Sequence, residues 1–165
     1  MDDSPPARAE YERAVDFAYR AMSRREHTIA EVRTFLEGKR VGPTAIDGAV
    51  AELREAGVLD DARYARRFAE DKRELERWGS ERIGRELRRR GIAPDLIDAV
   101  LSDRAREAEL ATALLVLEQR LPPPRDDRER DRAWRLLVRR GYEVEIAYEA
   151  VRAHERRAES DRRAA

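Results

Sequence analysis

The sequence predicts an all-α protein built from three tandem three-helix repeats, which resemble helix-turn-helix units and form an elongated curved array. Two observations carry this prediction. Apolar residues recur with the same steps of 4, 5, 5 and 4 residues in three places about fifty residues apart, and no segment shows the two-residue alternation of a half-buried strand. The three matching sets are Val32, Leu36, Val41, Ile46 and Val50; Ile83, Leu87, Ile92, Ile97 and Leu101; and Ala133, Leu137, Tyr142, Ala147 and Val151.

The first repeat is expected over residues 11–58, after a disordered tail over residues 1–10. Thr28 and Glu31 have the spacing of a capping box, in which each side chain accepts a hydrogen bond from the backbone N–H of the other residue. They therefore predict the start of the second helix. Pro43 then fits the first turn of the third helix, where its missing N–H costs nothing.

The second repeat is expected over residues 59–103. Its first helix has a capping aspartate, either Asp60 or Asp61. Ser80 can cap the second helix, and Gly91 ends it, because glycine readily takes the left-handed conformation that follows a helix. A proline then opens the third helix, as in the first repeat.

The third repeat is expected over residues 104–154, with a proline-rich loop over residues 121–127, where a helix cannot continue. Gly141 marks the turn between its last two helices. A frayed tail is expected over residues 155–165, since these residues are almost all polar.

Composition argues against an enzyme. The chain has no cysteine and a net charge of zero, with 42% charged residues, and it lacks the glycine-rich, nucleophile and zinc motifs that catalytic sites use. His27 and His154 are expected to be surface or capping residues. We therefore expect no catalytic residues, no cofactor and no metal. The absence of an apolar run of about 18 residues predicts no membrane span and a cytoplasmic protein.

The middle of the chain is locally basic, because residues 61–93 carry 11 basic and 7 acidic side chains. Such a region is typical of a surface that binds phosphates or an acidic protein face. The alternative is a solvated helix face laced with ion pairs. Trp78 is likewise either a staple over the core or a partner contact. The candidate partner-binding or DNA-binding residues are Arg66, Arg67, Lys72, Arg73, Arg77, Arg82, Arg85, Arg88, Arg89 and Arg90.

The last two helices of each repeat also suggest a DNA-binding helix-turn-helix. Acidic residues such as Asp95, Asp98 and Asp103 in the third helix argue against its entry into the major groove, because they would repel the phosphates. If DNA is bound, the second helices are the better candidates, and they would contact the backbone rather than base edges.

The stretches over residues 59–68 and 78–92 resemble the two strongest motifs of the bacterial RecX family, and the likeness extends over roughly residues 14–153. The family's three-by-three helical plan agrees with the predicted fold. Arg40 stands where the second repeat has Gly91, and Pro122–Pro124 interrupts the third repeat.

The resemblance implies a non-enzymatic regulator that binds in the groove of the filament of RecA on single-stranded DNA. Such proteins restrain filament growth, strand exchange and co-protease activity in DNA repair, recombination and the SOS response, and some also bind single-stranded or double-stranded DNA. We expect a monomer that inhibits the recombinase and ATPase activities of RecA. Three alternatives remain: a DNA-binding regulator that acts without RecA, a scaffold for another acidic protein, and an enzyme, in decreasing order.

Overall fold

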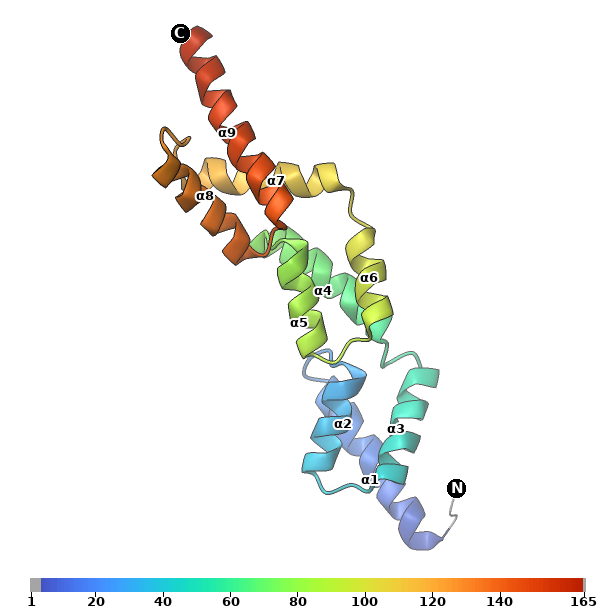
Figure 1. Ribbon diagram of the computed structural model, residues 1–165. Coiled ribbons are helices and arrows are strands. Elements are labelled where there is room, and N and C mark those ends of the chain that lie inside the picture. Colours follow the sequence, from blue (N-terminus) through green and yellow to red (C-terminus); the bar gives the residue numbers. More distant parts are fainter. Residues whose placement is uncertain (1–3, 165) are drawn as a thin grey trace. The chain divides into compact units, whose positions relative to one another are not determined.

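The computed structural model describes residues 4–164, and the side chains of residues 4–157. Within these residues it contains nine helices and no strand, which confirms the all-α prediction (Figure 1). The helices are α1 (Pro5–Met22), α2 (Ile29–Gly38), α3 (Pro43–Glu55), α4 (Asp61–Glu76), α5 (Ser80–Arg89), α6 (Pro94–Ser102), α7 (Arg106–Arg120), α8 (Asp127–Arg140) and α9 (Val144–Ala164).

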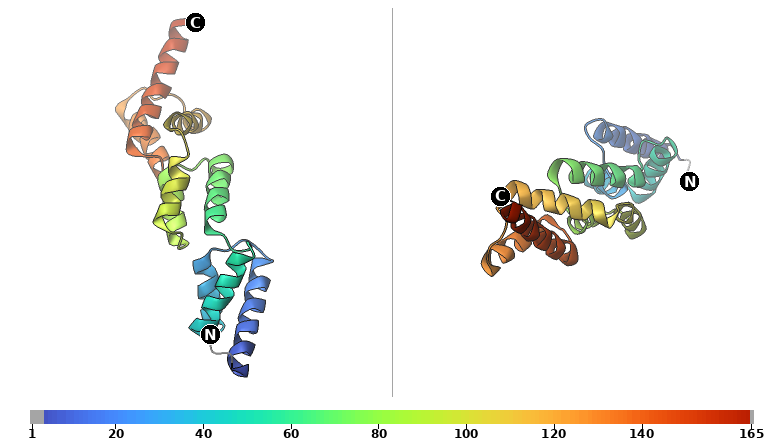
Figure 2. Two further views of the ribbon diagram at one scale, coloured as in Figure 1. Left: turned by 90° about the vertical axis from the view of Figure 1, so that its right-hand side faces the viewer. Right: turned by 90° about the horizontal axis from the view of Figure 1, so that it is seen from above.

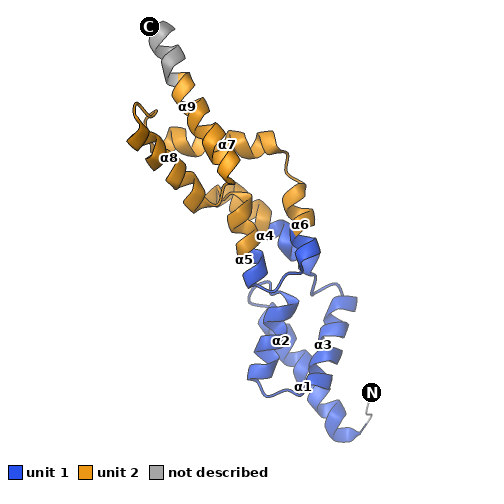
Figure 3. Ribbon diagram, in the orientation of Figure 1, with its two compact units in different colours: residues 1–67, 87–97 blue, residues 68–86, 98–165 orange. Residues whose placement is uncertain are grey.

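The chain forms two compact units (Figure 3). Unit 1 comprises residues 1–67 and 87–97, and unit 2 comprises residues 68–86 and 98–165. The division falls within α4, α5 and α6, so the middle repeat contributes residues to both units.

In unit 1, α1 packs against α2 and α3, and Figure 2 shows this bundle from two further directions. The first matching set of apolar residues, from Val32 to Val50, is buried throughout. The capping box of Thr28 and Glu31 is confirmed: the Thr28 hydroxyl accepts the Glu31 N–H, and the Glu31 carboxylate accepts the Thr28 N–H. Pro43 stands at the start of α3, as predicted.

In unit 2, α7 packs against α8 and α9. The third matching set, from Ala133 to Val151, is buried throughout, with Tyr142 only 1% exposed. In the middle set, Leu101 alone is partly exposed, and Val100 beside it is buried instead. The fixed steps therefore located the core of all three repeats.

The turn after the second helix of each repeat has a left-handed backbone. Gly91 and Gly141 have φ angles of 78° and 85°. At the aligned place in the first repeat, Arg40 has a φ of 59°. A side chain there costs roughly 1 kcal/mol, because Cβ approaches the following carbonyl, so the turn geometry is retained even without glycine.

The described helices extend into both stretches that were expected to be tails, residues 1–10 and 155–165. The structure has α1 beginning at Pro5, because a proline fits the first positions of a helix. At the other end α9 continues to Ala164, and its side chains Glu155 and Arg157 form ion pairs with Arg130 and Glu118. Residues 1–3 and 165 lie outside the described residues.

The proline-rich loop lies between the end of α7 and the start of α8. His154, which the sequence placed at the surface or in a cap, is buried beneath this loop. Its Nε2 lies 3.2 Å from the carbonyl oxygen of Leu121. The surface alternative was therefore wrong, because α9 extends past His154 and covers it. The capping alternative fits, since Leu121 is the C-cap residue of α7.

Candidate functional site

In unit 1 the Gly91 turn packs against the start of α2. The Thr28 hydroxyl donates a hydrogen bond of 2.7 Å to the Arg90 carbonyl oxygen. A Cβ atom on Gly91 would lie 2.4 Å from the Cβ of Ala30, so only glycine allows this approach. The guanidinium of Arg90 donates to the Tyr64 hydroxyl at 2.8 Å and to the Glu31 carboxylate at 3.3 Å. We call this contact the first joint.

In unit 2 the Gly141 turn packs against the start of α5 in the same way, forming a second joint. The Gly79 N–H donates to the Arg140 carbonyl oxygen, and the Glu81 N–H donates to the Gly141 carbonyl oxygen, each at 3.0 Å. A Cβ atom on Gly79 would lie 2.2 Å from the Gly141 oxygen. The buried Tyr142 hydroxyl adds a bond of 2.9 Å to a carbonyl oxygen of the α4–α5 turn.

The two joints use equivalent positions of the repeat. Thr28 and Gly79 each bond to the carbonyl oxygen of the arginine before a turn glycine, Arg90 in one joint and Arg140 in the other. The turn that follows the second helix of one repeat is thus seated on the start of the second helix of the preceding repeat. The periodic glycines predicted the positions of these turns in the sequence, but they did not predict which residues the turns contact.

A buried carboxylate caps α5. Glu109 of α7 accepts hydrogen bonds from the Ser80 N–H at 2.7 Å and from the Ser80 hydroxyl at 2.8 Å. Glu109 is buried, with only 6% of the residue exposed, and its carboxylate lies where the helix dipole favours an anion. The sequence predicted Ser80 as a cap, but Glu109 is 29 residues away along the chain and no local signal pointed to it.

Of the predicted arginines in unit 1, two serve the fold. Arg67 forms an ion pair of 2.6 Å with Glu26, and Arg90 belongs to the first joint. Arg66 and Arg88 are exposed and form no ion pair within the described part of the chain. A pocket of about 740 Å³ beside the first joint is lined by Arg88, Arg89 and Arg90 together with residues of α2.

His27 also lines this pocket, with its Nδ1 3.4 Å from a Glu31 carboxylate oxygen. Burial is the main cause that lowers its pKa, and the nearby Arg25 acts in the same direction. The lowered pKa favours the neutral imidazole more than in an exposed histidine, which agrees with a structural role for His27 in the wall of the pocket.

Of the predicted residues in unit 2, Lys72 and Arg73 are engaged within the fold. Lys72 forms an ion pair with Glu76. Arg73 donates to the Val100 carbonyl oxygen at 3.1 Å, and burial lowers its pKa. Arg85 is exposed and has no ion pair with any described residue.

Trp78 is partly buried and organises the cations around it. The guanidinium carbon of Arg82 lies 3.9 Å from the centre of the indole, and the ammonium of Lys72 lies 4.8 Å from it. The ring of Phe68 meets the indole edge-on at 6.4 Å. The indole is thus a platform that fixes the Arg82 side chain, because a guanidinium stacks well on an aromatic face.

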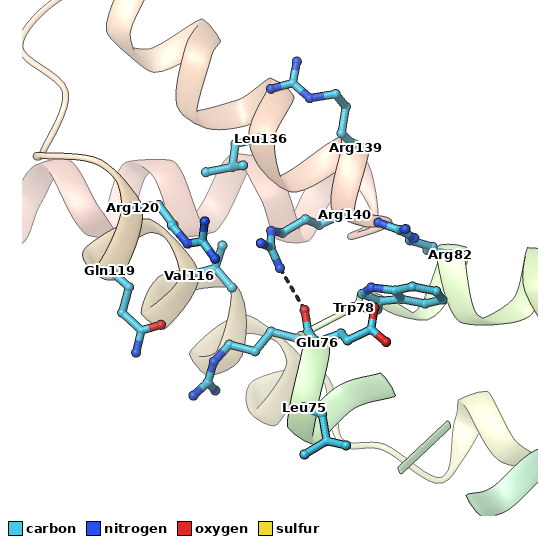
Figure 4. Close-up of a pocket in the computed structure, with 11 residues that line it drawn as sticks. Leu75, Glu76, Trp78, Arg82, Val116, Gln119, Arg120, Leu136, Arg139 and Arg140 are labelled. Atoms are coloured by element: carbon cyan, nitrogen blue, oxygen red, sulfur yellow. Dashed lines mark hydrogen bonds between the residues drawn. The ribbon is translucent and has the colours of Figure 1, made fainter. Parts of the chain in front are cut away.

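A groove of about 650 Å³ lies beside the second joint (Figure 4). Its wall comes from the ends of α4, α7 and α8, with Arg82 lying along the indole of Trp78 and Arg140 donating to the Glu76 carbonyl oxygen at 2.8 Å. The arginines that line it are Arg77, Arg82, Arg120, Arg139 and Arg140. The sequence prediction included the first two and missed the other three, because they belong to the third repeat and lie outside the locally basic stretch.

Two other kinds of site have no basis in the described residues. No helix there is long and apolar enough to cross a membrane. No group of three or more histidine, aspartate or glutamate side chains in the same residues is placed to hold a metal ion. The basic pocket of unit 1 and the basic groove of unit 2 are two features that the described residues offer to a partner.

Comparison with known proteins identifies the family. The model of the RecX second three-helix domain matches residues 60–101. The Regulatory protein RecX of Trichlorobacter lovleyi is 35% identical over 134 residues, which cover 78% of this chain and 87% of that protein. The Regulatory protein RecX of Halorhodospira halophila is 37% identical over 140 residues, covering 84% and 86%.

Solved structures give the same fold. RecX from Lactobacillus salivarius superposes with a TM-score of 0.82 at 15% identity, covering 89% of this chain and 97% of that one. A second regulatory protein RecX superposes with a TM-score of 0.77 at 19% identity, covering 90% and 74%. With the helical repeats, the family domain over the middle repeat and relatives matched over most of their length, the chain belongs to the RecX family.

Proposed function

We propose that this chain is a non-enzymatic regulator that binds the RecA filament as a monomer and inhibits its recombinase, ATPase and co-protease activities in DNA repair and the SOS response. The observation that carries the proposal is membership of the RecX family, whose matched relatives are named regulatory proteins. The helical repeat fold supports it, because a repeat array offers a long surface rather than a single catalytic pocket.

The exposed arginines of α5 supply a surface that can act without chemistry. Arg85 and Arg88 are exposed and have no ion-pair partner among the described residues. Side chains that are not committed to the fold can form charged contacts with a partner, and such contacts set association rate and specificity. Their loss should weaken binding without unfolding the helix.

The test is the ATPase activity of RecA on single-stranded DNA, with this protein titrated in. We expect inhibition by the wild type and at least about tenfold weaker inhibition by an Arg85→Glu/Arg88→Glu variant. Each reversal replaces an attraction by a repulsion, which costs about 1 kcal/mol per residue and therefore about 2 kcal/mol for the pair. The matched control is Arg128→Glu/Arg132→Glu, which reverses two exposed arginines of α8 that form no ion pair with a described residue.

The outcome separates the possibilities. Inhibition that is equally strong in the α5 variant and the control removes the α5 surface from the proposal. An ATPase activity that the wild type leaves unchanged contradicts the proposed function itself. Binding of the protein to DNA without RecA, strong at about 0.15 M salt, would instead favour the DNA-binding alternative.

A further inference from the structure

The groove of unit 2 carries an excess of positive charge. Five arginines and a single acidic residue, Glu76, line it. The Glu76 carboxylate is paired with Lys72. Arg77, Arg120 and Arg139 form no ion pair with any described residue. Even when the Glu76 carboxylate is counted against the five arginines, the groove presents at least about four uncompensated positive charges.

The negative ends of the helix dipoles offset only part of this excess of positive charge. The ends of α4, α7 and α8 meet at the groove, and each helix C-terminus carries roughly half a negative charge. Three such ends offset about 1.5 positive charges, which leaves more than two. One arginine, Arg140, is already committed to an α4 carbonyl. The remaining cations exceed what helix capping needs, so they are available for an external anion.

The groove is not a surface for stacking bases. One face of the Trp78 indole is covered by Arg82 at 3.9 Å, Lys72 lies 4.8 Å from its centre, and Phe68 lies against its edge. Proteins that bind single-stranded nucleic acid offer free aromatic faces to the bases, and the aromatic side chain here is occupied within the fold.

Apolar side chains lie among the arginines instead. Leu75 is 79% exposed, and Leu136 and Val116 also line the groove. A large exposed leucine beside cations matches a ligand that combines carboxylates with an apolar side chain. The Arg82 guanidinium, with its face on the indole, keeps its N–H edges in the plane where a carboxylate can accept two hydrogen bonds.

We propose that this groove binds an acidic protein segment in which aspartate or glutamate residues are interspersed with leucine-like residues. The inference rests on the proposed function in one respect: the segment is assigned to the RecA filament. The carboxylates contact Arg77, Arg82, Arg120 and Arg139, and an apolar side chain of the segment packs against Leu75.

The binding test uses two probes of equal charge at about 0.15 M salt: a labelled peptide of alternating glutamate and leucine, and a labelled oligothymidylate. We expect fluorescence anisotropy to show tighter binding of the peptide to the full chain. An Arg120→Glu/Arg139→Glu variant should bind the peptide at least about tenfold more weakly, because each reversed charge costs about 1 kcal/mol or more. The Arg128→Glu/Arg132→Glu variant should bind it as the wild type does.

Two binding results would overturn the proposal. One is peptide affinity that is equal in the groove variant and the control. The other is tighter binding of the oligothymidylate that is lost in the groove variant, since this would make the groove a nucleic-acid site. Far-ultraviolet circular dichroism of each variant verifies that the helices are intact.

The same variants in the RecA ATPase assay separate this inference from the proposed function. If the wild type inhibits RecA and the groove variant does not, both stand. If the groove variant loses the peptide but inhibits RecA fully, the assignment of the segment to the filament is wrong. If the wild type has no effect on RecA while the peptide still binds at the groove, the proposed function fails and the filament assignment falls with it.

Discussion

Replacing Gly79 with alanine should open the second joint. A Cβ atom there would lie 2.2 Å from the Gly141 carbonyl oxygen, which belongs to the backbone and cannot swing away. Relief requires α5 and the Gly141 turn to separate, and that separation breaks the two backbone hydrogen bonds of 3.0 Å across the joint. The substitution therefore combines steric overlap with lost hydrogen bonds.

The magnitude follows from these contacts. Overpacking a tight contact costs about 1–3 kcal/mol, and two backbone hydrogen bonds contribute about 2 kcal/mol net. Alanine also restricts the unfolded chain, which returns about 0.4–1 kcal/mol. We expect Gly79→Ala to lower the free energy of unfolding by about 3 kcal/mol, which corresponds to a Tm lower by roughly 6–12 °C for a chain of this size.

The assay is urea unfolding followed by tryptophan fluorescence. Both tryptophans of the chain, Trp78 and Trp134, belong to unit 2, so the fluorescence reports the unit that contains Gly79. Far-ultraviolet circular dichroism, recorded in the same titration, reports the helices of both units and therefore also covers unit 1, which contains the control position Gly38. The control is Gly38→Ala, because nothing lies within 4 Å of a Cβ atom at Gly38, and this change should leave the protein as stable or slightly more so. Equal stability of the two variants would refute the close approach on which the joint depends.

Two further predictions concern the joints. Burial raises the pKa of Tyr142 from 10.0 to about 12, so the folded state holds the phenolic proton more tightly than the unfolded state does. The resulting stabilisation is complete below pH 10, and about 3 kcal/mol of it is lost as the pH rises from 10 to about 12. Tm measured against pH should therefore fall more steeply for the wild type than for Tyr142→Phe, and parallel curves would contradict this. Thr28→Val removes the hydroxyl that caps α2 and donates to the Arg90 carbonyl oxygen. It should lower the free energy of unfolding by about 2–3 kcal/mol, as measured by urea unfolding followed by circular dichroism. Thr44→Val at an exposed position of α3 should change it by less than about 0.5 kcal/mol, so equal losses in the two variants would argue against the Thr28–Arg90 hydrogen bond.

The helical repeats could be predicted from the sequence because their signals are local. The steps between apolar residues follow from helix and turn geometry, and the capping box at Thr28 spans only four residues. The turn glycines Gly91 and Gly141 mark positions where the backbone must be left-handed. Each of these features depends on neighbours along the chain, so it can be recognised without a structure.

The joints and the groove could not be predicted, because they bring together residues far apart in sequence. Glu109 caps a helix that begins 29 residues earlier, and Arg140 bonds to Glu76 across 64 residues. The locally basic stretch pointed to Arg77 and Arg82 but not to the cations of the third repeat. Charge counted along the chain therefore found only part of a surface that the fold assembles.

Long-range contacts also decided which predicted cations are available to a partner. Arg90 lies in the basic stretch, but its guanidinium reaches Glu31 and the Tyr64 hydroxyl at the first joint. Arg73 is engaged with a carbonyl of α6. In contrast, Arg85 and Arg88 remain exposed on α5. A sequence pattern weighs all these arginines alike, and only their packing separates structural from available charges.

We propose that this chain acts by binding the assembled RecA filament through charged surfaces of its helical repeats. The most direct measurement is an anisotropy titration of the labelled full chain with RecA preassembled on single-stranded DNA, beside a titration with the same DNA alone, both at about 0.15 M salt. We expect binding to the filament that is at least about tenfold tighter than binding to the bare DNA. Equal affinity for the two, or no binding to the filament, would contradict it.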